Sequence, residues 1–181
     1  MEQYSEQQQK MLDLWQKHMS AEFERFDADE TMQTMVEIPH NINVPTLAGG
    51  VNATEVHEFY SKYFLRQLAP DTNVILISRT IGNDRVIDEI IFEFTHSIVM
   101  DWILPGVPPT GKKVRIPFVV IVEVREGKVA SEHIFWDQAS VLVQVGLIDP
   151  EKLPAVGAEQ AEKLLHPESV PSNFILAKRR K

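Results

Sequence analysis

The sequence contains no cysteine among its 181 residues. Disulfide bonds, thiolate nucleophiles and thiolate zinc sites are therefore excluded. Basic residues are also scarce, with 18 lysines and arginines against 26 acidic residues and a formal net charge of -8. This balance speaks against a nucleic-acid-binding surface, which needs an excess of positive charge. The run Lys-Arg-Arg-Lys at residues 178–181 is interpreted as a solvated tail.

Long hydrophobic runs are absent as well, since no apolar stretch approaches the roughly 20 residues that span a bilayer. The first residues are polar and acidic, so we expect no signal peptide and a cytoplasmic protein. The sequence has no Gly-x-Ser-x-Gly nucleophile elbow and no glycine-rich phosphate loop after a strand. Its histidines are too scattered for a recognisable ligand spacing, so neither a metal nor a cofactor is predicted.

The first third of the chain has helical periodicity. Apolar residues recur every three or four positions over residues 7–26, which predicts an amphipathic helix. A short second helix carrying Met32, Met35 and Val36 is predicted to end at Pro39. Residues 40–47 then read as a short edge strand, because Pro45 cannot donate to a central ladder. Asn52 is predicted to cap a third helix over residues 53–68.

The periodicity changes to two after residue 72. It predicts strands over 74–81, 86–104, 114–124 and 129–143, joined by short turns into an antiparallel meander. Helices followed by a meander favour an α+β fold, in which a curved antiparallel sheet and the N-terminal helices enclose a pocket. Residues 1–148 are predicted to form this domain, and residues 149–181 a C-terminal arm with one weak helix.

One face of the predicted strand 86–104 combines large apolar residues with a single histidine. Its members are Phe92, Phe94, His96, Ile98, Met100 and Trp102. Burial on this face disfavours the charged imidazole, so His96 is a candidate acid or base. The alternative is a core histidine whose ring nitrogen is satisfied by a backbone carbonyl. We expect Phe92, Phe94, Met100 and Trp102, together with Tyr60 and Trp136, to line the pocket.

A second group of polar residues falls near the end of the last predicted strand. Glu132, His133 and Asp137 lie within six residues of one another, beside Trp136. A carboxylate in an apolar pocket has a raised pKa, which suits proton transfer near neutral pH. The alternative is a surface ion pair with Lys112, Arg115 or Arg125. Alternation alone does not decide which face of this strand points inward.

The second half of the sequence contains four distinctive short segments: Leu-Pro-Gly-Val-Pro-Pro-Thr-Gly-Lys-Lys at 104–113, Gly-Lys-Val at 127–129, Trp-Asp-Gln at 136–138 and Val-Gln-Val-Gly-Leu at 143–147. These segments resemble the SnoaL-like polyketide cyclases of the nuclear transport factor 2-like superfamily. The resemblance implies a conical α+β fold over about residues 10–148. It also implies that Asp137 is the acid/base. The family's pocket histidine would fall at Met100, so His96 departs from that pattern.

Together these features predict a cofactor-independent acid/base enzyme of the cyclase, isomerase or dehydratase type. Its substrate would be a small, apolar carbonyl compound, a class that includes polyketide-like molecules. Asp137 would take a proton beside the carbonyl, and His96 or a tyrosine such as Tyr60 or Tyr63 would stabilise or protonate the enolate oxygen. Glu132, His133 and Asp101 are further catalytic candidates.

The alternative is a small-ligand-binding or dimeric accessory protein without turnover, because a fold does not determine function. The two hypotheses differ in whether Asp137 and His96 converge on one enclosed cavity. A homodimer is expected in either case, formed through the outer sheet face with Val99, Val119 and Ile121. No nucleic-acid or membrane partner is expected.

Overall fold

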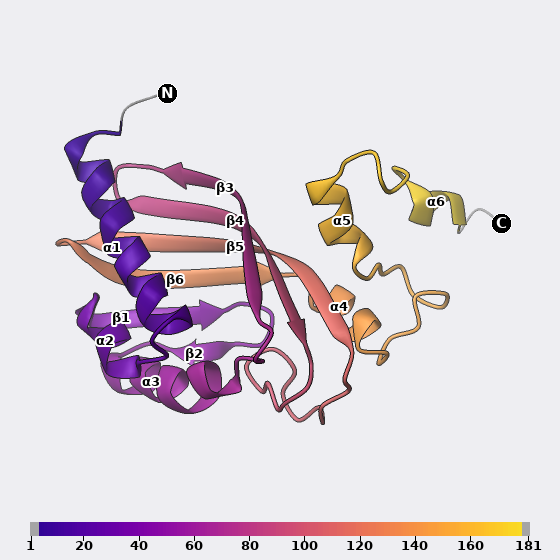
Figure 1. Ribbon diagram of the computed structural model, residues 1–181, viewed down its shortest axis with the longest axis horizontal. Helices are drawn as coiled ribbons and strands as arrows, with labels where there is room; N and C mark the ends of the chain where they lie inside the picture. Colours follow the sequence, from indigo (N-terminus) through magenta and orange to yellow (C-terminus); the bar gives the residue numbers. More distant parts are fainter. Residues whose placement is uncertain (1–3, 179–181) are drawn as a thin grey trace.

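The computed structural model describes residues 4–178, and Figure 1 shows their arrangement. The basic residues Arg179, Arg180 and Lys181 of the predicted tail lie outside this range. The helical elements are α1 (Glu6–Phe23), α2 (Ala28–Gln33), α3 (Ala53–Glu58), the π-helical turn η1 (Phe59–Phe64), the 3₁₀ turn η2 (Leu65–Gln67), α4 (Gln138–Gln144), α5 (Glu159–Leu165) and α6 (Phe174–Lys178). The strands are β1 (Met35–Asn43), β2 (Ala48–Gly50), β3 (Asn73–Ile81), β4 (Arg85–Thr95), β5 (Lys113–Arg125) and β6 (Lys128–Trp136).

The strands form one open, curved six-stranded sheet in the order β2-β1-β6-β5-β4-β3. The predicted antiparallel meander is confirmed for β3 to β6. One pairing differs from the expectation, because β1 lies parallel to β6. Helix α1 crosses one face of the sheet, while α2 and α3 lie beside β1 and β2 (Figure 1). The predicted α+β fold class is therefore confirmed.

The first strand begins and ends earlier than predicted, at Met35–Asn43 instead of residues 40–47. Met35 and Val36 belong to β1 and not to the second helix, which ends at Gln33. Pro39 lies inside β1, where the pairing with β6 is irregular between Met35 and His40. A missing backbone donor is tolerated at such an irregularity. Strand β1 is also not an edge strand, because β2 and β6 flank it.

The two long strands predicted for the second half are both shorter in the structure. Strand β4 ends at Thr95, and residues 96–112 form a loop closed by hydrogen bonds between His96 and both Gly111 and Lys112. Strand β6 ends at Trp136 because the Asp137 side chain accepts from the backbone N–H groups of Ala139 and Ser140 and starts α4. Asp, as an N-cap, offers the first helical turn a partner that a strand would not use.

An aromatic stack runs across the inner face of the sheet. Phe92, Phe118 and Trp136 come from three neighbouring strands, with ring centroids 5.1 and 4.9 Å apart and nearly parallel planes. Trp102 reaches this stack from the 96–112 loop and meets all three rings edge-on. Such offset and edge-to-face contacts add stability beyond the buried area. This stack forms one wall of the core beneath α1.

The C-terminal residues pack at one end of the sheet, beyond α4 (Figure 1). Arg115 of β5 forms an ion pair with Glu162 of α5, with 3.2 Å between nitrogen and oxygen. Ser140 of α4 donates to the carbonyl of Gly157 at 2.8 Å. The division into a domain at 1–148 and an arm from 149 stays a prediction.

A close approach of β2 to α3 fixes the position of the helical segment that carries Tyr60. A Cβ atom at Gly50 would lie 2.5 Å from Cβ of Glu55 and 2.6 Å from the nitrogen of Val56. We expect Gly50→Ala to lower the free energy of unfolding by about 1–3 kcal/mol, the usual cost of overpacking. Gly82→Ala is the matched control, because its Cβ would meet only the Arg85 carbonyl oxygen at 3.6 Å. Urea unfolding measures both, and equal effects would contradict the steric account.

Candidate active site

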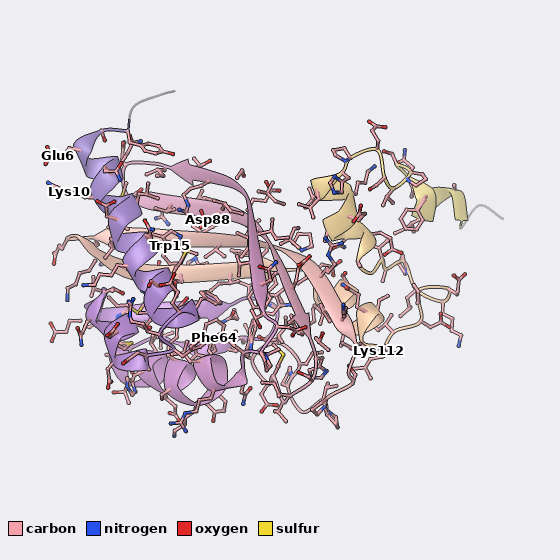
Figure 2. All side chains as sticks on the ribbon, in the orientation of Figure 1. Glu6, Lys10, Trp15, Phe64, Asp88 and Lys112 are labelled. Carbon is pink, nitrogen blue, oxygen red and sulfur yellow. The ribbon has the colours of Figure 1, made fainter. Side chains whose placement is uncertain are left out.

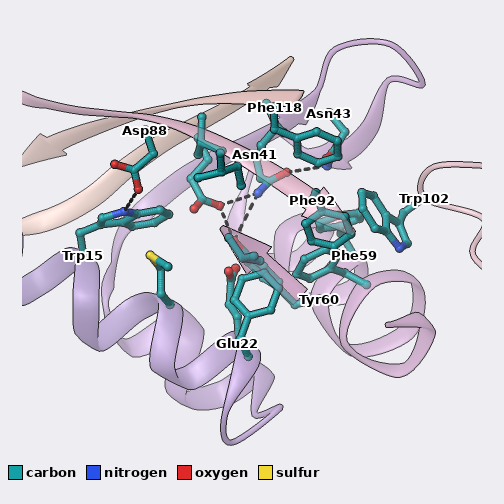
Figure 3. A pocket seen from close by; sticks show the side chains of 18 residues that line it. Trp15, Glu22, Asn41, Asn43, Phe59, Tyr60, Asp88, Phe92, Trp102 and Phe118 are labelled. Atoms are coloured by element: carbon teal, nitrogen blue, oxygen red, sulfur yellow. Dashed lines mark hydrogen bonds between the residues drawn. The ribbon is translucent and has the colours of Figure 1, made fainter. Parts of the chain in front are cut away.

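A small cavity lies between α1, η1 and the inner face of the sheet (Figure 3). Its volume is about 70 Å³, which accommodates a few water-sized groups and is smaller than pockets that enclose drug-sized ligands. The wall is mostly apolar and aromatic. The lining residues that come from the sheet and carry polar groups are Asn41, Asn43, Asp88 and Glu132, while Trp15, Glu22 and Tyr60 come from the helices.

Three buried titratable side chains meet at one side of this cavity. Nε2 of His18 lies 3.3 Å from a carboxylate oxygen of Glu22 and 3.2 Å from one of Glu132. His18 and Glu22 are one helical turn apart on α1, so they share a face of that helix. Glu132 faces them from β6. All three are buried, so their charges are not screened by solvent.

The hydroxyl of Thr34 fixes the orientation of the imidazole. It donates to the carbonyl of Thr31 at 2.6 Å, so its oxygen accepts from Nδ1 of His18, also at 2.6 Å. Nδ1 therefore carries a proton, and Nε2 is the atom that faces the two carboxylates. Burial alone lowers the pKa of His18, but Glu132 and Glu22 outweigh it and raise the pKa to about 10. The imidazole is thus a cation at neutral pH.

Glu132 is the carboxylate that stays ionised. The hydroxyl of Tyr60 and the amide of Asn41 both donate to the same oxygen at 2.5 Å, while His18 faces the other oxygen. Burial raises the pKa of Glu132, but His18, Tyr60 and Asn41 outweigh it and lower the pKa below its usual range. The same environment raises the pKa of Tyr60, through burial and the neighbouring charge of Glu132. Tyr60 therefore remains a hydroxyl donor.

Glu22 is the group in this cluster that can exchange a proton. Burial raises its pKa, the charge of His18 lowers it and the charge of Glu132 raises it, with a net increase. The single positive charge of His18 neutralises one buried carboxylate. Glu132 is that carboxylate, because it also accepts hydrogen bonds from Tyr60 and Asn41. Glu22 lines the cavity, so the proton it takes or gives can pass to a molecule bound there.

Tyr60 lies in η1, a π-helical turn between α3 and η2. Inserted π turns displace side chains from their regular helical positions and occur often at functional sites. The predicted third helix is therefore confirmed as a helical segment, but not as a uniform α-helix. The irregular turn directs Tyr60 to Glu132, and the ring is fully buried.

Trp15 and Asp88 lie side by side at the other end of the cavity (Figures 2 and 3). The indole N–H of Trp15 donates to Asp88 at 2.8 Å, and Arg79 binds both carboxylate oxygens of Asp88 at 2.6 Å. The same indole stacks on the imidazole of His18 with ring centroids 5.4 Å apart. The Arg79–Asp88 ion pair thus positions the indole of Trp15 against the imidazolium of His18.

Four of the residues predicted from the sequence line the cavity. Glu132 and Tyr60 belong to the polar cluster, and Phe92 and Trp102 to the apolar wall. Phe94, Met100 and Trp136 are buried in the core instead of lining the cavity. Glu132 is buried and pairs with His18, and no arginine or lysine among residues 4–178 forms an ion pair with it, so the interpretation as a surface ion pair with Lys112, Arg115 or Arg125 is wrong for this residue.

The expected convergence of Asp137 and His96 on one cavity does not occur. The Asp137 side chain is exposed and caps α4, and it also accepts from Gln160 at 2.5 Å. His96 is buried at the start of the 96–112 loop, where its Nδ1 contacts the hydroxyl and backbone N–H of Thr110. The expected carbonyl partner for its ring is therefore replaced by Thr110.

The remaining two catalytic candidates, His133 and Asp101, also lie away from the cavity. His133 points to the outer face of the sheet, where its ring meets that of His40. Asp101 accepts from the backbone of Gly106 and from Gln67, and it lies at a separate surface cleft. The outward position of His133 follows from alternation along β6, because the neighbours of the inward-facing Glu132 face outward.

His18 and Glu22 were missed from the sequence. Both lie on the apolar stripe of the first predicted helix, at helical spacing from Trp15. A histidine and a glutamate four residues apart on a buried helical face are a detectable signal for a paired, inward-facing site. Asn41, which donates to Glu132, has no comparable signal in the sequence, because part of β1 was assigned to the second helix.

The model of the SnoaL-like polyketide cyclase family matches residues 5–145. The chain belongs to this family. Among solved structures it is similar to one from Jannaschia sp. CCS1 that is described as a SnoaL-like polyketide cyclase, with a TM-score of 0.67 and 16% identity over 82% of this chain and 100% of that one. Comparison with the curated proteins gives no match.

Two further structures show the same fold. One is AclR from Streptomyces galilaeus, described as a hydroxylase, with a TM-score of 0.60 and 20% identity over 79% of this chain and 99% of that one. The other has a ketosteroid isomerase-like fold and comes from Catenulispora acidiphila, with a TM-score of 0.57 and 12% identity over 75% and 94% of the two chains. The described helices include none with the length and apolar character of a membrane span.

The ion pairs of His18 lead to a testable titration. Because its folded-state pKa is raised from 6.5 to about 10, the contribution of His18 to the free energy of unfolding is complete below pH 6.5 and is lost as the pH rises through about 10. Histidine NMR should therefore show one imidazole that stays charged at pH 8. A spectrum in which every imidazole is neutral at that pH would contradict the assignment.

Proposed function

We propose that this SnoaL-like protein is a cofactor-independent acid/base enzyme that moves a proton on a small carbonyl compound. The observation that carries the proposal is Glu22, a carboxyl group of raised pKa that lines an apolar cavity beside a buried, oriented ion pair. Burial that raises the pKa of a carboxyl group prepares it for proton transfer near neutral pH. Membership of the family supports this class of chemistry.

In the proposed reaction, ionised Glu22 takes the proton from the carbon beside the substrate carbonyl. The proton ends on the Glu22 carboxyl, and the electron pair of the broken C–H bond passes to the carbonyl oxygen as an enolate. Glu22 then returns the proton to another carbon, which completes an isomerisation. In a ring closure, the enolate carbon attacks a second carbonyl, and the oxygen of that carbonyl takes the proton from Glu22. His18 stabilises the ionised form of Glu22 before the transfer, at a separation of 3.3 Å.

Tyr60 is the proposed donor to the enolate oxygen. Tyr60 lines the cavity, its hydroxyl donates a hydrogen bond to Glu132, and Asn41 donates to that hydroxyl at 3.2 Å. A hydroxyl held in this way needs a small rotation to donate to a bound oxygen instead. Glu132 remains as the counter-charge to His18, so the net charge of the pair does not change during the reaction.

The cavity wall favours a flat, largely apolar substrate. Phe92 and Phe118 present stacked rings, and Phe59 of η1 and Trp102 of the 96–112 loop complete the wall. Phe59 and Trp102 also border a surface cleft of about 420 Å³. Movement of these two side chains would join the cleft to the cavity and admit a ring larger than the closed cavity holds.

The proposal is tested by α-proton exchange of small cyclic ketones in D₂O, followed by NMR, which detects enolisation without knowledge of the natural product. Glu22→Gln should lower the exchange rate about 10²–10⁴-fold, the usual contribution of a general base. Tyr60→Phe should lower it about 10²-fold or more through loss of the oxyanion donor. Both changes keep the side-chain shape, and melting temperatures check that the variants fold.

Asp137→Asn is the control that separates this proposal from the sequence-based prediction. The exchange rate should stay within about twofold of the wild type, because Asp137 caps α4 outside the cavity. Loss of exchange in Asp137→Asn, with Glu22→Gln unaffected, would contradict the proposal and support Asp137 as the base. Retention of ketone binding without exchange in the wild type would support the accessory-protein alternative.

A metal-dependent reaction is a second outcome of the same assay. His18, Glu22 and Glu132 offer one atom each within 4.8 Å of one another, which is close enough for a single ion. On the acid/base proposal, the exchange rate is unchanged by EDTA. Loss of exchange with EDTA, restored by a divalent cation, would contradict a cofactor-independent mechanism.

We also propose a homodimer formed through the outer sheet face. Val119 of β5 is 39% exposed and Phe135 of the neighbouring β6 is 40% exposed, and the two are opposite each other in the sheet. Val99 lies in the 96–112 loop and not on the sheet, which removes it from the expected interface. Val119→Lys should therefore shift the mass in light scattering from dimer to monomer. A wild-type monomer at micromolar concentration would contradict this assignment.

A further inference from the structure

Two histidines lie together on the outer face of the sheet, away from the cavity. His40 belongs to β1 and His133 to β6, which run parallel to each other. In the register of the two strands, His40 is opposite Ser131 and His133 is opposite Ile42. The two rings are thus diagonal neighbours on one face, with their centroids 5.1 Å apart and their planes tilted by 32°. Both side chains are partly exposed in the single chain, where His133 lies beside the Val119–Phe135 surface proposed for the homodimer.

The Nε2 atoms of the two rings point at each other. They are 3.0 Å apart, the distance of a hydrogen bond in which one imidazole N–H donates to the other ring. Two nitrogen ligands at about 2.0–2.1 Å from a tetrahedral zinc ion are roughly 3.3 Å apart. One ion can therefore bind both nitrogens after the two side chains rotate so that the nitrogens turn from each other toward a common point.

The surroundings of His40 favour its neutral imidazole, the form that binds metal ions. Burial lowers the pKa of His40, and the charge of His133 lowers it further. Glu123 acts in the opposite direction and supplies a negative charge on the same face. It lies beside Ser131, whose hydroxyl is 3.5 Å from its carboxylate. Arg125 partly offsets that charge.

We propose that His40 and His133 form a binding site for a divalent transition-metal ion, with Glu123 as a nearby carboxylate. Imidazole pairs suit Zn²⁺, Ni²⁺ and Cu²⁺, and Cu²⁺ binds most tightly in this series. Water would complete the coordination. The site is independent of the proposed acid/base chemistry, because His133 and Glu132 point to opposite faces of β6.

The test uses tag-free full-length protein titrated with Cu²⁺, Ni²⁺ and Zn²⁺ chlorides by isothermal calorimetry. The wild type should bind one ion per chain, and His40→Ala and His133→Ala should each weaken binding at least tenfold. His166→Ala is the matched control, because His166 is an exposed histidine in a different element, after α5. It should bind as the wild type does. The melting temperature without metal checks that each variant is folded.

Electron paramagnetic resonance of the Cu²⁺ complex gives a readout that does not depend on any variant. It should show coupling to two imidazole nitrogens at one copper per chain. Several outcomes would overturn the proposal: no binding below about millimolar metal, equal binding by wild type and the His40→Ala, His133→Ala double variant, or coupling to one nitrogen only. Binding that is retained in the double variant but lost in His18→Gln would place the ion in the cavity instead.

Discussion

The architecture of the site depends on one buried interaction, the imidazolium of His18 held between two carboxylates. The hydroxyl of Thr34 fixes which nitrogen faces them, and the two oxygens lie 3.2 and 3.3 Å from that nitrogen. A buried charge of this kind is costly unless it is paired and hydrogen-bonded, so the surrounding elements must be placed accurately. Helix α1 supplies the cation and one carboxylate, and β6 supplies the other. The position of α1 on the sheet is therefore tied to the chemistry of the cavity.

The two carboxylates differ because their surroundings differ. Glu132 accepts from Tyr60 and Asn41 in addition to facing His18, so its ionised form is stabilised. Glu22 faces the apolar cavity, where burial disfavours its ionised form and raises its pKa. Pairs of titratable groups whose pKa values are pushed apart in this way have distinct acid and base roles. The proposed role of Glu22 as the base depends on this difference between the two carboxylates more than on the family's fold.

Much of the fold could be predicted from the sequence, because hydrophobic periodicity reports which face of an element is buried. The period of two located the four meander strands, and the motif around residues 104–147 indicated the family. The same period also extended β4 and β6 too far. Met100 and Trp102 are buried in a loop, and Asp137 starts a helix. The alternation of apolar and polar residues does not distinguish either case from a continued strand. Glu132 and Tyr60 were predicted for the site, whereas His18 and Glu22 were not. The distance between α1 and β6 in the folded chain could not be read from the local pattern.

The protonation state of Glu22 tests the central claim most directly. Infrared spectroscopy resolves protonated carboxyl groups, and its pH dependence can be followed for the wild type and for Glu22→Gln and Glu132→Gln. The account predicts a protonated carboxyl band that persists above pH 4.5, the ordinary pKa of a glutamate, and that disappears in Glu22→Gln. A band that is absent from the wild type at such pH values, or that is unchanged in Glu22→Gln, would contradict it.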